Sequence, residues 1–333
     1  MLRDNDFAGV LPTELFASPS LTTLDAGSNR FVSSIPTQAG ARTALATLLL
    51  QGSSLTGSIP SALFLSSSLR AFNVDDNSLS GGIPLTIGAT TGLTTFSARY
   101  NPLGGPLPSQ LGALGSLRAL ALDGCSLTGT LPSELGGLQN LETLSLSLNA
   151  LRGALPSQLG RLTSLHDLDV AYNQFTSSVP TELGLLESLG QIDLSSNQLS
   201  GDAMPTEVGG MTSLVSLRVN ANLLDGAVPT ELGLCERLEE LALDDNFRLA
   251  ATLPTELGRL AELTSLCAHA LRRPRASRSS PTPTAPAHHR ARRARPPLCR
   301  RVAGARPARR SSALCPRSSA RPHACARCAS TRA

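Results

Sequence analysis

Apolar residues recur along most of this chain at one fixed interval. In each unit of 24 residues, three leucine, isoleucine or valine side chains keep the same spacing, as at Leu141, Leu144 and Leu146. The alternation from Leu144 to Leu146 is the pattern of a short strand with both leucines on its buried side. Because one such unit cannot bury its own leucines, the pattern predicts short parallel strands stacked from unit to unit.

A second regularity is a proline that follows leucine, isoleucine or valine. These prolines occur in eleven registers, 24 residues apart at first and then with one extra residue inserted twice: Pro12, Pro36, Pro60, Pro84, Pro108, Pro132, Pro156, Pro180, Pro205, Pro229 and Pro254. Proline fixes φ and begins the return segment of each unit. Segments such as 132–136, which end in glycine, are predicted to form a single tight helical turn.

A third regularity is an asparagine seven or eight residues before each proline. Its buried amide is expected to satisfy backbone groups of its own coil and of the neighbouring one. Ser53 and Cys125 occupy two gaps in this series, and Cys125 is interpreted as a small buried donor in place of asparagine. The predicted structural ladder is Asn29, Asn77, Asn101, Asn149, Asn173, Asn197, Asn222 and Asn246.

The unit from Leu141 to Ser164, LETLSLSLNALRGALPSQLGRLTS, resembles the plant-type leucine-rich repeat, LxxLxLxxNxLxGxIP. The resemblance extends over residues 2 to about 266. It implies an α/β solenoid, a horseshoe or right-handed superhelix with parallel strands on the concave face and short 3-10 or helical turns on the convex face. Residues 1–271 are thus expected to form about eleven repeats, of which the first and last are incomplete.

Charge divides the chain into two segments. All 25 acidic residues precede position 263 and face twelve arginines there, which leaves a net charge of −13, whereas residues 272–333 hold 17 arginines and no acid. This Arg/Ala/Pro/Ser-rich tail is predicted to be disordered. The alternatives are an artefact of the gene model, a featureless linker, or a basic arm for nucleic acid. The arm lacks the aromatic side chains of single-strand binders, so nucleic acid is not the favoured partner.

Enzymatic signatures are missing from the sequence. It contains no phosphate-binding loop, no HExxH and no GxSxG motif. His166 lies beside Asp167 and Asp169, but no nucleophile accompanies them, so a solvated face is the favoured interpretation. Cys325 and Cys328 lack a second pair with metal-finger spacing. We therefore expect no enzyme, no cofactor and no metal.

The sequence assigns no compartment. It holds no apolar run long enough for a membrane helix and no secretory signal. Met1 lies in the middle of a repeat, whereas secreted members of the resembled family begin with a signal peptide and a cap. Either the gene model is truncated, which is the favoured interpretation, or this is an intracellular or simplified algal-type array. For a truncated ectodomain the resemblance implies an extracellular or membrane-associated location.

A binding surface is predicted on the outward side chains of the concave strands, among which Asp25, Asp123 and Asp244 are also counted. Arg70, Arg99 and Arg118 with Tyr100 have the composition of an interface hot spot. An acidic band at Asp167, Asp169 and Asp193 attracts a basic peptide or protein, or else keeps a leucine-rich array soluble. The candidate ligand-binding residues are Arg70, Arg99, Tyr100, Arg118, Asp167, Asp169, Tyr172, Asp193 and Arg218.

These features favour a scaffold that recognises a protein or peptide through its concave face. The resemblance leaves two alternatives open. One is the truncated ectodomain of a membrane receptor-like kinase or receptor-like protein. The other is an inhibitor of a secreted hydrolase.

Overall fold

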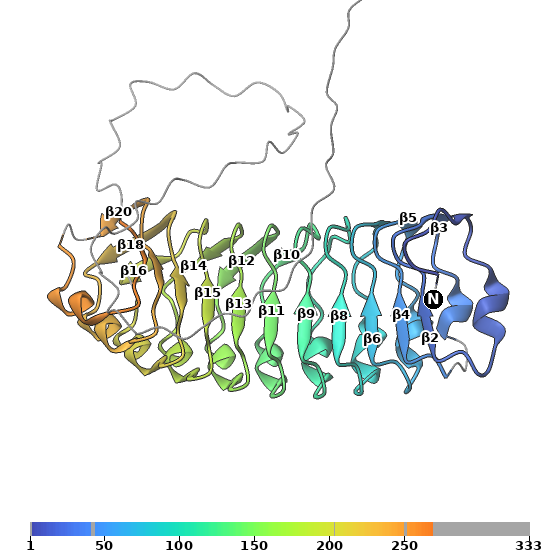
Figure 1. Cartoon of the computed structure of the whole chain (residues 1–333), viewed down its shortest axis with the longest axis horizontal. Helices are drawn as coiled ribbons and strands as arrows, with labels where there is room; N and C mark the ends of the chain where they lie inside the picture. The colour runs from blue at the N-terminus through green and yellow to red at the C-terminus, as the bar shows by residue number, and fades with distance from the viewer. Residues whose placement is uncertain (1, 41–43, 203, 250–251, 269–333) are drawn as a thin grey trace, which may run out of the picture. The chain divides into compact units, whose positions relative to one another are not determined.

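The computed structural model describes residues 2–40, 44–202, 204–249 and 252–268. The predicted tail at 272–333 and the nucleic-acid hypothesis that depends on it lie outside the described residues. Within them the chain winds through successive coils, and each coil contributes one strand to a continuous parallel sheet (Figure 1).

The main sheet follows chain order from strand to strand. Neighbouring strands pair one repeat apart, as where Leu144 lies opposite Leu168. In the described residues its strands are β2 (Thr23–Asp25), β4 (Thr47–Leu49), β6 (Ala71–Asn73), β8 (Thr95–Ser97), β9 (Ala119–Ala121), β11 (Thr143–Ser145), β13 (Asp167–Asp169), β15 (Gln191–Asp193), β17 (Ser216–Arg218), β19 (Glu240–Ala242) and β21 (Ser265–Cys267). The predicted stack of parallel strands is confirmed.

Shorter parallel sheets form where each coil leaves the main sheet. The first is β1 (Ala8–Gly9), β3 (Arg30–Ser33), β5 (Ser54–Gly57) and β7 (Ser78–Leu79). The second is β10 (Thr128–Gly129), β12 (Ala150–Ala154) and β14 (Gln174–Thr176). The third is β16 (Ser200–Asp202), β18 (Asn222–Gly226) and β20 (Asn246–Leu249).

A short 3-10 helix follows the proline of the coil, as the sequence predicts. Proline precedes the helix in extended conformation, as Pro156 does with φ −69° and ψ 133°. The helices are η1 (Thr13–Ala17), η2 (Thr37–Gly40), η3 (Ser61–Leu65), η4 (Leu85–Ala89), η5 (Ser109–Ala113), η6 (Ser133–Gly137), η7 (Ser157–Arg161), η8 (Thr181–Leu185), η9 (Thr206–Gly210), η10 (Thr230–Leu234) and η11 (Thr255–Arg259).

Glycine lets these 3-10 helices approach one another. A Cβ built on Gly160 would lie 2.3 Å from the carbonyl oxygen of Glu182 in the next coil and 2.6 Å from its Cβ. No side chain fits at that separation without moving backbone, so glycine here sets the spacing of the coils on the side opposite the main sheet.

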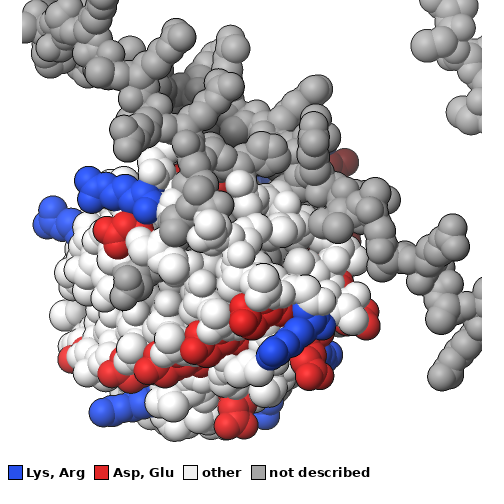
Figure 2. Space-filling view, turned by 90° about the vertical axis from the view of Figure 1, so that its left-hand side faces the viewer, with Lys and Arg blue, Asp and Glu red and all other residues white. Residues whose placement is uncertain are grey.

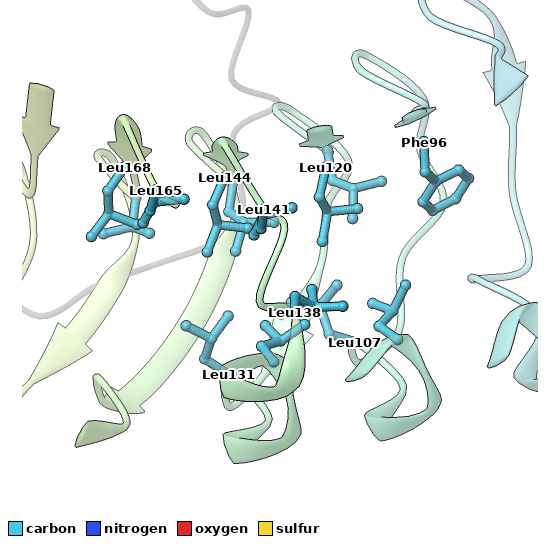
Figure 3. Close-up of a cluster of buried hydrophobic side chains, with 14 of the residues drawn as sticks. Phe96, Leu107, Leu120, Leu131, Leu138, Leu141, Leu144, Leu165 and Leu168 are labelled. Atoms are coloured by element: carbon cyan, nitrogen blue, oxygen red, sulfur yellow. The ribbon is translucent and has the colours of Figure 1, made fainter. Parts of the chain in front are cut away.

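The core lies between the main sheet and the 3-10 helices. Strand residues Leu120, Leu144 and Leu168 stack in a row and point toward Leu131 and Leu138 on the helical side (Figure 3). Leu120 and Leu144 are fully buried. Each leucine packs against the equivalent leucines of the coils before and after it, so each coil helps to bury the core of its neighbours.

Phenylalanine replaces leucine in one stretch of this core. Phe72 on β6 and Phe96 on β8 stack with ring centroids 5.7 Å apart. Phe64 from η3 meets both rings edge-on, at 5.6 and 5.9 Å. These separations are typical of favourable aromatic pairs, so the larger side chains pack here without disrupting the coil spacing.

The asparagine ladder satisfies backbone groups as each coil leaves the sheet. The Nδ2 of Asn173 donates to the carbonyls of Leu146, Val170 and Ala171 at 3.0–3.1 Å. Its Oδ1 accepts the backbone N–H of Leu151 at 3.0 Å. One amide therefore binds groups of its own coil and of the coil before it, which water would otherwise have to satisfy.

Cys125 takes the place of asparagine in one coil of this ladder and makes only some of its hydrogen bonds. Its Sγ donates to the carbonyl of Ala98 at 3.0 Å, the place that an asparagine Nδ2 takes in other coils. Burial raises the pKa of this thiol to about 12, so it remains a neutral donor. Cysteine has no second polar atom, and the N–H of Leu103 instead binds the carbonyl of Asn101 at 2.7 Å across Pro102.

Ser53 fills the other gap without such compensation. Its Oγ is buried and has no hydrogen-bond partner among the described residues. The short side chain does not reach the carbonyls that asparagine would bind, so the ladder is interrupted at this coil.

Candidate functional site

The candidate site is the outward surface of the main sheet, called here the strand face. Alternate residues of each strand point outward, and the same position recurs one coil later, about 4.8 Å away. Backbone pairing continues beyond the strand ends, as from the N–H of Leu146 to the carbonyl of Asp169 and from Tyr172 to Ser195. Side chains at equivalent positions therefore form rows across the coils.

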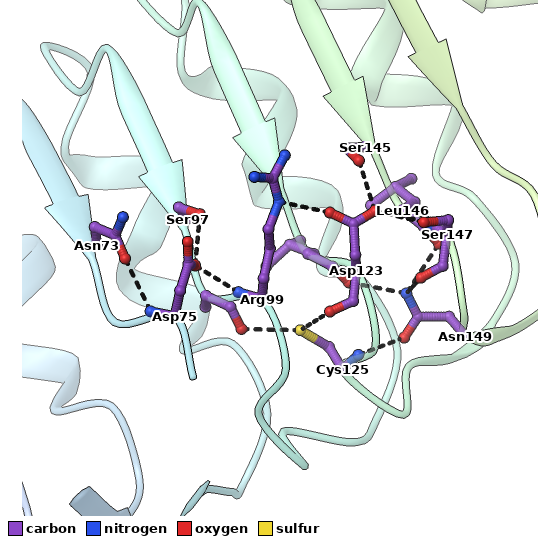
Figure 4. Close-up of polar contacts among 12 residues, drawn as sticks. Asn73, Asp75, Ser97, Arg99, Asp123, Cys125, Ser145, Leu146, Ser147 and Asn149 are labelled. Carbon is purple, nitrogen blue, oxygen red and sulfur yellow. Dashed lines mark hydrogen bonds and ion pairs between the residues drawn. The ribbon is translucent and has the colours of Figure 1, made fainter. Parts of the chain in front are cut away.

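One polar cluster on this face centres on Asp123, which follows β9. The carboxylate accepts Ser145 Oγ at 2.5 Å, Ser147 N–H at 3.0 Å and Ser147 Oγ at 2.8 Å (Figure 4). Its other oxygen accepts Arg99 Nε at 2.6 Å. Asp123 is 5% exposed, and four donors compensate for the loss of water around its charge.

Asp75 continues this cluster toward the N-terminus. Its Oδ1 accepts Ser97 Oγ at 2.6 Å and the Arg99 N–H at 2.7 Å (Figure 4). Burial raises the pKa of Asp75, and these two hydrogen bonds together with the Arg99 charge oppose that rise. Asp75, Arg99 and Asp123 occupy one position in three successive coils, so a cation lies between two anions.

The three arginines predicted as a hot spot lie at opposite ends of their strands. Arg70 precedes β6 and Arg118 precedes β9, whereas Arg99 follows β8. Each is held within the chain. Arg70 donates to the carbonyls of Ser67 and Leu69, and Arg118 pairs with Glu142. The structure does not join them in one group, and Arg99 belongs to the polar cluster instead.

A depression of about 280 Å³ lies farther along the strand face, across β11, β13, β15 and β17. We call it the acidic pocket, because three of the four charged side chains around it are aspartates. Four of the predicted residues line it together: Asp167, Asp169, Asp193 and Arg218. Gln191, also counted among the outward residues from the sequence, lines it too. The sequence prediction did not include three further polar members, whose signal was their place between the strand leucines: Thr143, Ser145 and Ser216.

Asp169 is a carboxylate of this pocket whose pKa is raised. It is half-buried and accepts the N–H of Ala171 at 3.0 Å. Desolvation by burial raises its pKa most and the charge of Asp193 on the adjacent strand adds to the rise, while hydrogen bonds from the Ala171 N–H and the Ser147 side chain oppose it. Asp169 pairs in register with Asp193, so the two carboxylates lie on neighbouring strands at the same position.

Arg218 closes the acidic pocket on its C-terminal side, yet it is turned toward β19. Its Nε and NH2 bind the two oxygens of Glu240 at 3.0 and 2.7 Å, whereas its nearest nitrogen is 3.5 Å from Asp193 Oδ2. The hydrogen bonds to Arg218 lower the pKa of Glu240, and Glu240 in turn raises that of Arg218. The pocket thus retains more negative than positive charge.

Large exposed hydrophobic side chains recur at one position of the repeat, in two coils of the acidic pocket and in one coil before them. Tyr100, Leu148 and Tyr172 are 52%, 50% and 55% exposed and occupy one position in their coils, directly before the ladder residue. Gly124 holds this position in the coil between Tyr100 and Leu148, and a Cβ there would lie 2.8 Å from Tyr100 Cδ1. We call Tyr100, Leu148 and Tyr172 the apolar row.

The backbone holds the apolar row in an unusual conformation. Tyr100, Leu148 and Tyr172 have φ of 54°, 58° and 53°, in the left-handed region where a non-glycine residue is strained by about 1 kcal/mol or more. The stacked coils impose this turn at the same position repeatedly. The side chains are therefore presented from a rigid backbone rather than from a loose loop.

Three predicted outward residues are corrected by the structure. Asp25, Asp123 and Asp244 are 7%, 5% and 7% exposed, so none presents a free carboxylate on the strand face. Asp123 shows the reason, because small serines in the next coil let it fold inward and donate to it. Leu148 was missed in turn, although a large apolar residue at an outward position was a readable signal.

Acidic side chains are common away from the strand face as well. The first turns of six 3-10 helices carry a glutamate, as at Glu182, Glu207 and Glu231. Seen from the C-terminal end of the repeats, acidic side chains run in a row across the surface (Figure 2). Negative charge alone therefore does not define a site, and the acidic pocket is distinguished by its hollow shape and by the exposed Leu148 and Tyr172 in the same coils.

The described part of the chain shows neither a metal-binding cluster nor a membrane-spanning helix. No three His, Cys, Asp or Glu side chains there are grouped to hold a metal ion. None of its helices has the length and apolar character needed to cross a membrane.

Comparison with known proteins supports the repeat assignment. A family model described as leucine rich repeat matches residues 115–175. The LRR ectodomain of the Arabidopsis thaliana membrane receptor kinase GASSHO1/SCHENGEN3, solved with CASPARIAN STRIP INTEGRITY FACTOR 2, is 33% identical over 80% of this chain and 34% of its own, with a TM-score of 0.66. No curated protein matches the chain in sequence.

Other solved structures share the fold with different functions. The ectodomain of the Arabidopsis receptor kinase HAESA, in complex with an IDA peptide hormone, is 33% identical over 79% of this chain and 44% of its own, with a TM-score of 0.73. A plant ice-binding protein is 25% identical over 76% of this chain and 82% of its own, with a TM-score of 0.64. The chain spans less than half of either receptor ectodomain.

The stacked coils, each with one strand, a ladder residue and a 3-10 turn, define a leucine-rich-repeat solenoid. The LxGxIP half of the repeats and the receptor ectodomains among the structural neighbours make it a leucine-rich-repeat protein of the plant type.

Proposed function

We propose that this chain is a recognition scaffold that binds a peptide or a segment of a protein on its strand face. The observation that supports the proposal most directly is the acidic pocket, which shares two coils with the apolar row, on strands that pair with their neighbours through backbone hydrogen bonds. A preformed surface of this kind loses little conformational entropy on binding. Its mixture of exposed tyrosines and charges is typical of interfaces.

Two of the solved neighbours are receptor ectodomains, and one of them, HAESA, is in complex with a peptide hormone ligand, which supports a peptide ligand for this chain. We place this chain, by that likeness, with ectodomain fragments of receptor-like proteins, which favours an extracellular location. The ice-binding neighbour shows that the fold alone does not fix the ligand.

The test is selection of the full chain against a displayed library of random 12-residue peptides, with two tryptophan variants. Gln191→Trp places a large side chain in the acidic pocket on β15. Gln174→Trp places the same side chain at an exposed position on β14, away from the strand face. We expect enriched peptides that bind the wild-type chain and Gln174→Trp, and that lose at least tenfold in affinity for Gln191→Trp.

Two results would overturn the proposal. One is that no peptide is enriched over the library background. The other is that the enriched peptides bind Gln191→Trp as well as they bind the wild-type chain.

A further inference from the structure

The acidic pocket and the apolar row share two coils. The coil of β11 gives Thr143 to the pocket and Leu148 to the row, and the coil of β13 gives Asp169 and Tyr172. The chain contains only two tyrosines, and both lie in the row. A ligand that covers one feature therefore reaches the other.

Negative charge in the acidic pocket has no full counter-charge within the described residues. Arg218 is the one arginine of its lining, and its charge is shared: Nε and NH2 bind Glu240, and NH1 lies 3.5 Å from Asp193 Oδ2. Asp169 and Asp193 keep facing each other across about 4.8 Å of strand spacing. A cation from outside would relieve that repulsion and replace the lost hydration of Asp169.

The geometry distinguishes between the two kinds of cationic side chain. Two carboxylates on adjacent strands present parallel acceptors, which a planar guanidinium can bind with separate N–H groups. A lysine ammonium is a compact point charge that keeps its hydration more strongly, and it lacks this fork. Arginine is accordingly the side chain that matches the pair of Asp169 and Asp193.

The distance between the features sets the spacing in the ligand. Tyr172 follows Asp169 by three residues, so their backbones are at most about 10 Å apart. An extended peptide rises about 3.3 Å per residue and covers this distance in about three residues. An apolar ligand residue about three positions from the arginine would therefore rest on the apolar row.

We propose that the strand face binds an extended peptide segment through an arginine between Asp169 and Asp193 and an apolar residue, about three positions away, on Leu148 and Tyr172. This inference rests on the proposed function and adds the chemistry of the ligand to it. The arginine supplies selectivity through paired charges, and the apolar residue supplies buried area.

The peptides enriched from the random 12-residue library provide the probe. We expect arginine in most of them, with an apolar residue about three positions from it. Replacing that arginine by citrulline, which keeps the shape and removes the charge, is expected to weaken binding to the full chain at least tenfold. Replacing it by lysine is expected to weaken binding by a smaller factor.

Variants of the chain locate the effect. The double variant Asp169→Asn/Asp193→Asn keeps side-chain size and removes both charges, so arginine and citrulline peptides should bind it about equally. Glu187→Gln/Glu236→Gln removes two charges at exposed positions before β15 and β19, and should keep the tenfold preference. Circular dichroism and thermal unfolding of each variant check that the fold is retained.

The outcomes separate this inference from the proposed function. Peptides that lose binding to Gln191→Trp but show no arginine preference would overturn the inference and leave the proposed function standing. An arginine preference that persists in Asp169→Asn/Asp193→Asn would also overturn it. Failure to enrich any strand-face peptide would remove both.

Discussion

Asp123 and Asp169 lie two coils apart on the strand face, and they differ in burial and in the groups that surround them. Asp123 is buried, and two serine hydroxyls, a backbone N–H and a guanidinium donate to it. Asp169 is half-buried, faces a second carboxylate in register, and has its pKa raised. The difference separates a carboxylate that holds coils together from one that we propose binds a ligand.

Neighbours one coil away produce this difference. The residues 24 positions before and after Asp123 are Arg99 and Ser147, and both donate hydrogen bonds to it. Opposite Asp169, the next coil offers another aspartate. In a stacked array, the role of an outward residue therefore depends on the residues 24 positions before and after it, more than on its neighbours in sequence.

The largest effect is expected from removing the compensated carboxylate. Asp123→Ala would leave Arg99 and Ser145 without their acceptor inside the cluster, and we expect it to lower the free energy of unfolding by about 3 kcal/mol. Urea unfolding followed by circular dichroism measures the loss. Glu187→Ala, at an exposed position, is the control and should change stability by about 0.5 kcal/mol or less. A loss below about 1 kcal/mol for Asp123→Ala would contradict the structural role.

A smaller effect is expected at the boundary between the two groups. Gly124→Ala places a Cβ 2.8 Å from the Tyr100 ring at φ +63°, and should cost about 1–2 kcal/mol. Part of that cost comes from the ring, so it should fall in a Tyr100→Ala background. If thermal unfolding shows the same loss in both backgrounds, Tyr100 does not rest on Gly124.

The smallest change in the free energy of unfolding is expected at Asp169, and it has the opposite sign. Because the folded-state pKa of Asp169 is raised, its stabilising contribution is present below the unfolded pKa of about 3.8 and is lost as pH rises through the folded value. Asp169→Asn should therefore increase the free energy of unfolding at pH 7, by about 0.5 kcal/mol or less. The gain should shrink as pH falls toward 4, in a series of urea titrations.

Glu240 provides the matched control for that pH series. Its pKa is lowered by Arg218, so its contribution is present above the unfolded pKa of about 4.5 and is lost as pH falls through the folded value. Glu240→Gln should destabilise at pH 7 and lose this effect in acid. Equal signs for the two variants at pH 7 would contradict the comparison between paired and unpaired carboxylates.

The fold was predictable because one period controls every level of it. The spacing of Leu141, Leu144 and Leu146 marks the strand, Pro156 marks the turn, and their repetition marks the stack. Even the donor role of Cys125 follows from its place in the ladder. Each of these inferences uses a position within one coil, which the repeat makes visible in sequence.

The strand face was predictable only in part, because its chemistry depends on contacts between coils. The repeat frame located Asp169 and Asp193 on the outward surface, and whether they bind a ligand stays a prediction. It did not show that Asp123 turns inward, since that depends on the small serines at 145 and 147. Nor did it show that Arg118 pairs with Glu142, exactly one repeat later, a spacing that a comparison of successive coils would have revealed.

The gap in the asparagine ladder at Ser53 bears on how the array opens. Ladder side chains form hydrogen bonds between each coil and the one before it. In a stacked protein, such contacts between coils determine where unfolding begins and how far it spreads. Because Ser53 does not form these hydrogen bonds, we expect the first coils to separate as a unit at the boundary near Ser53. The acidic pocket and the apolar row both lie beyond that boundary, in the block from Tyr100 to Arg218, so fraying at the N-terminal end would leave the proposed recognition surface intact.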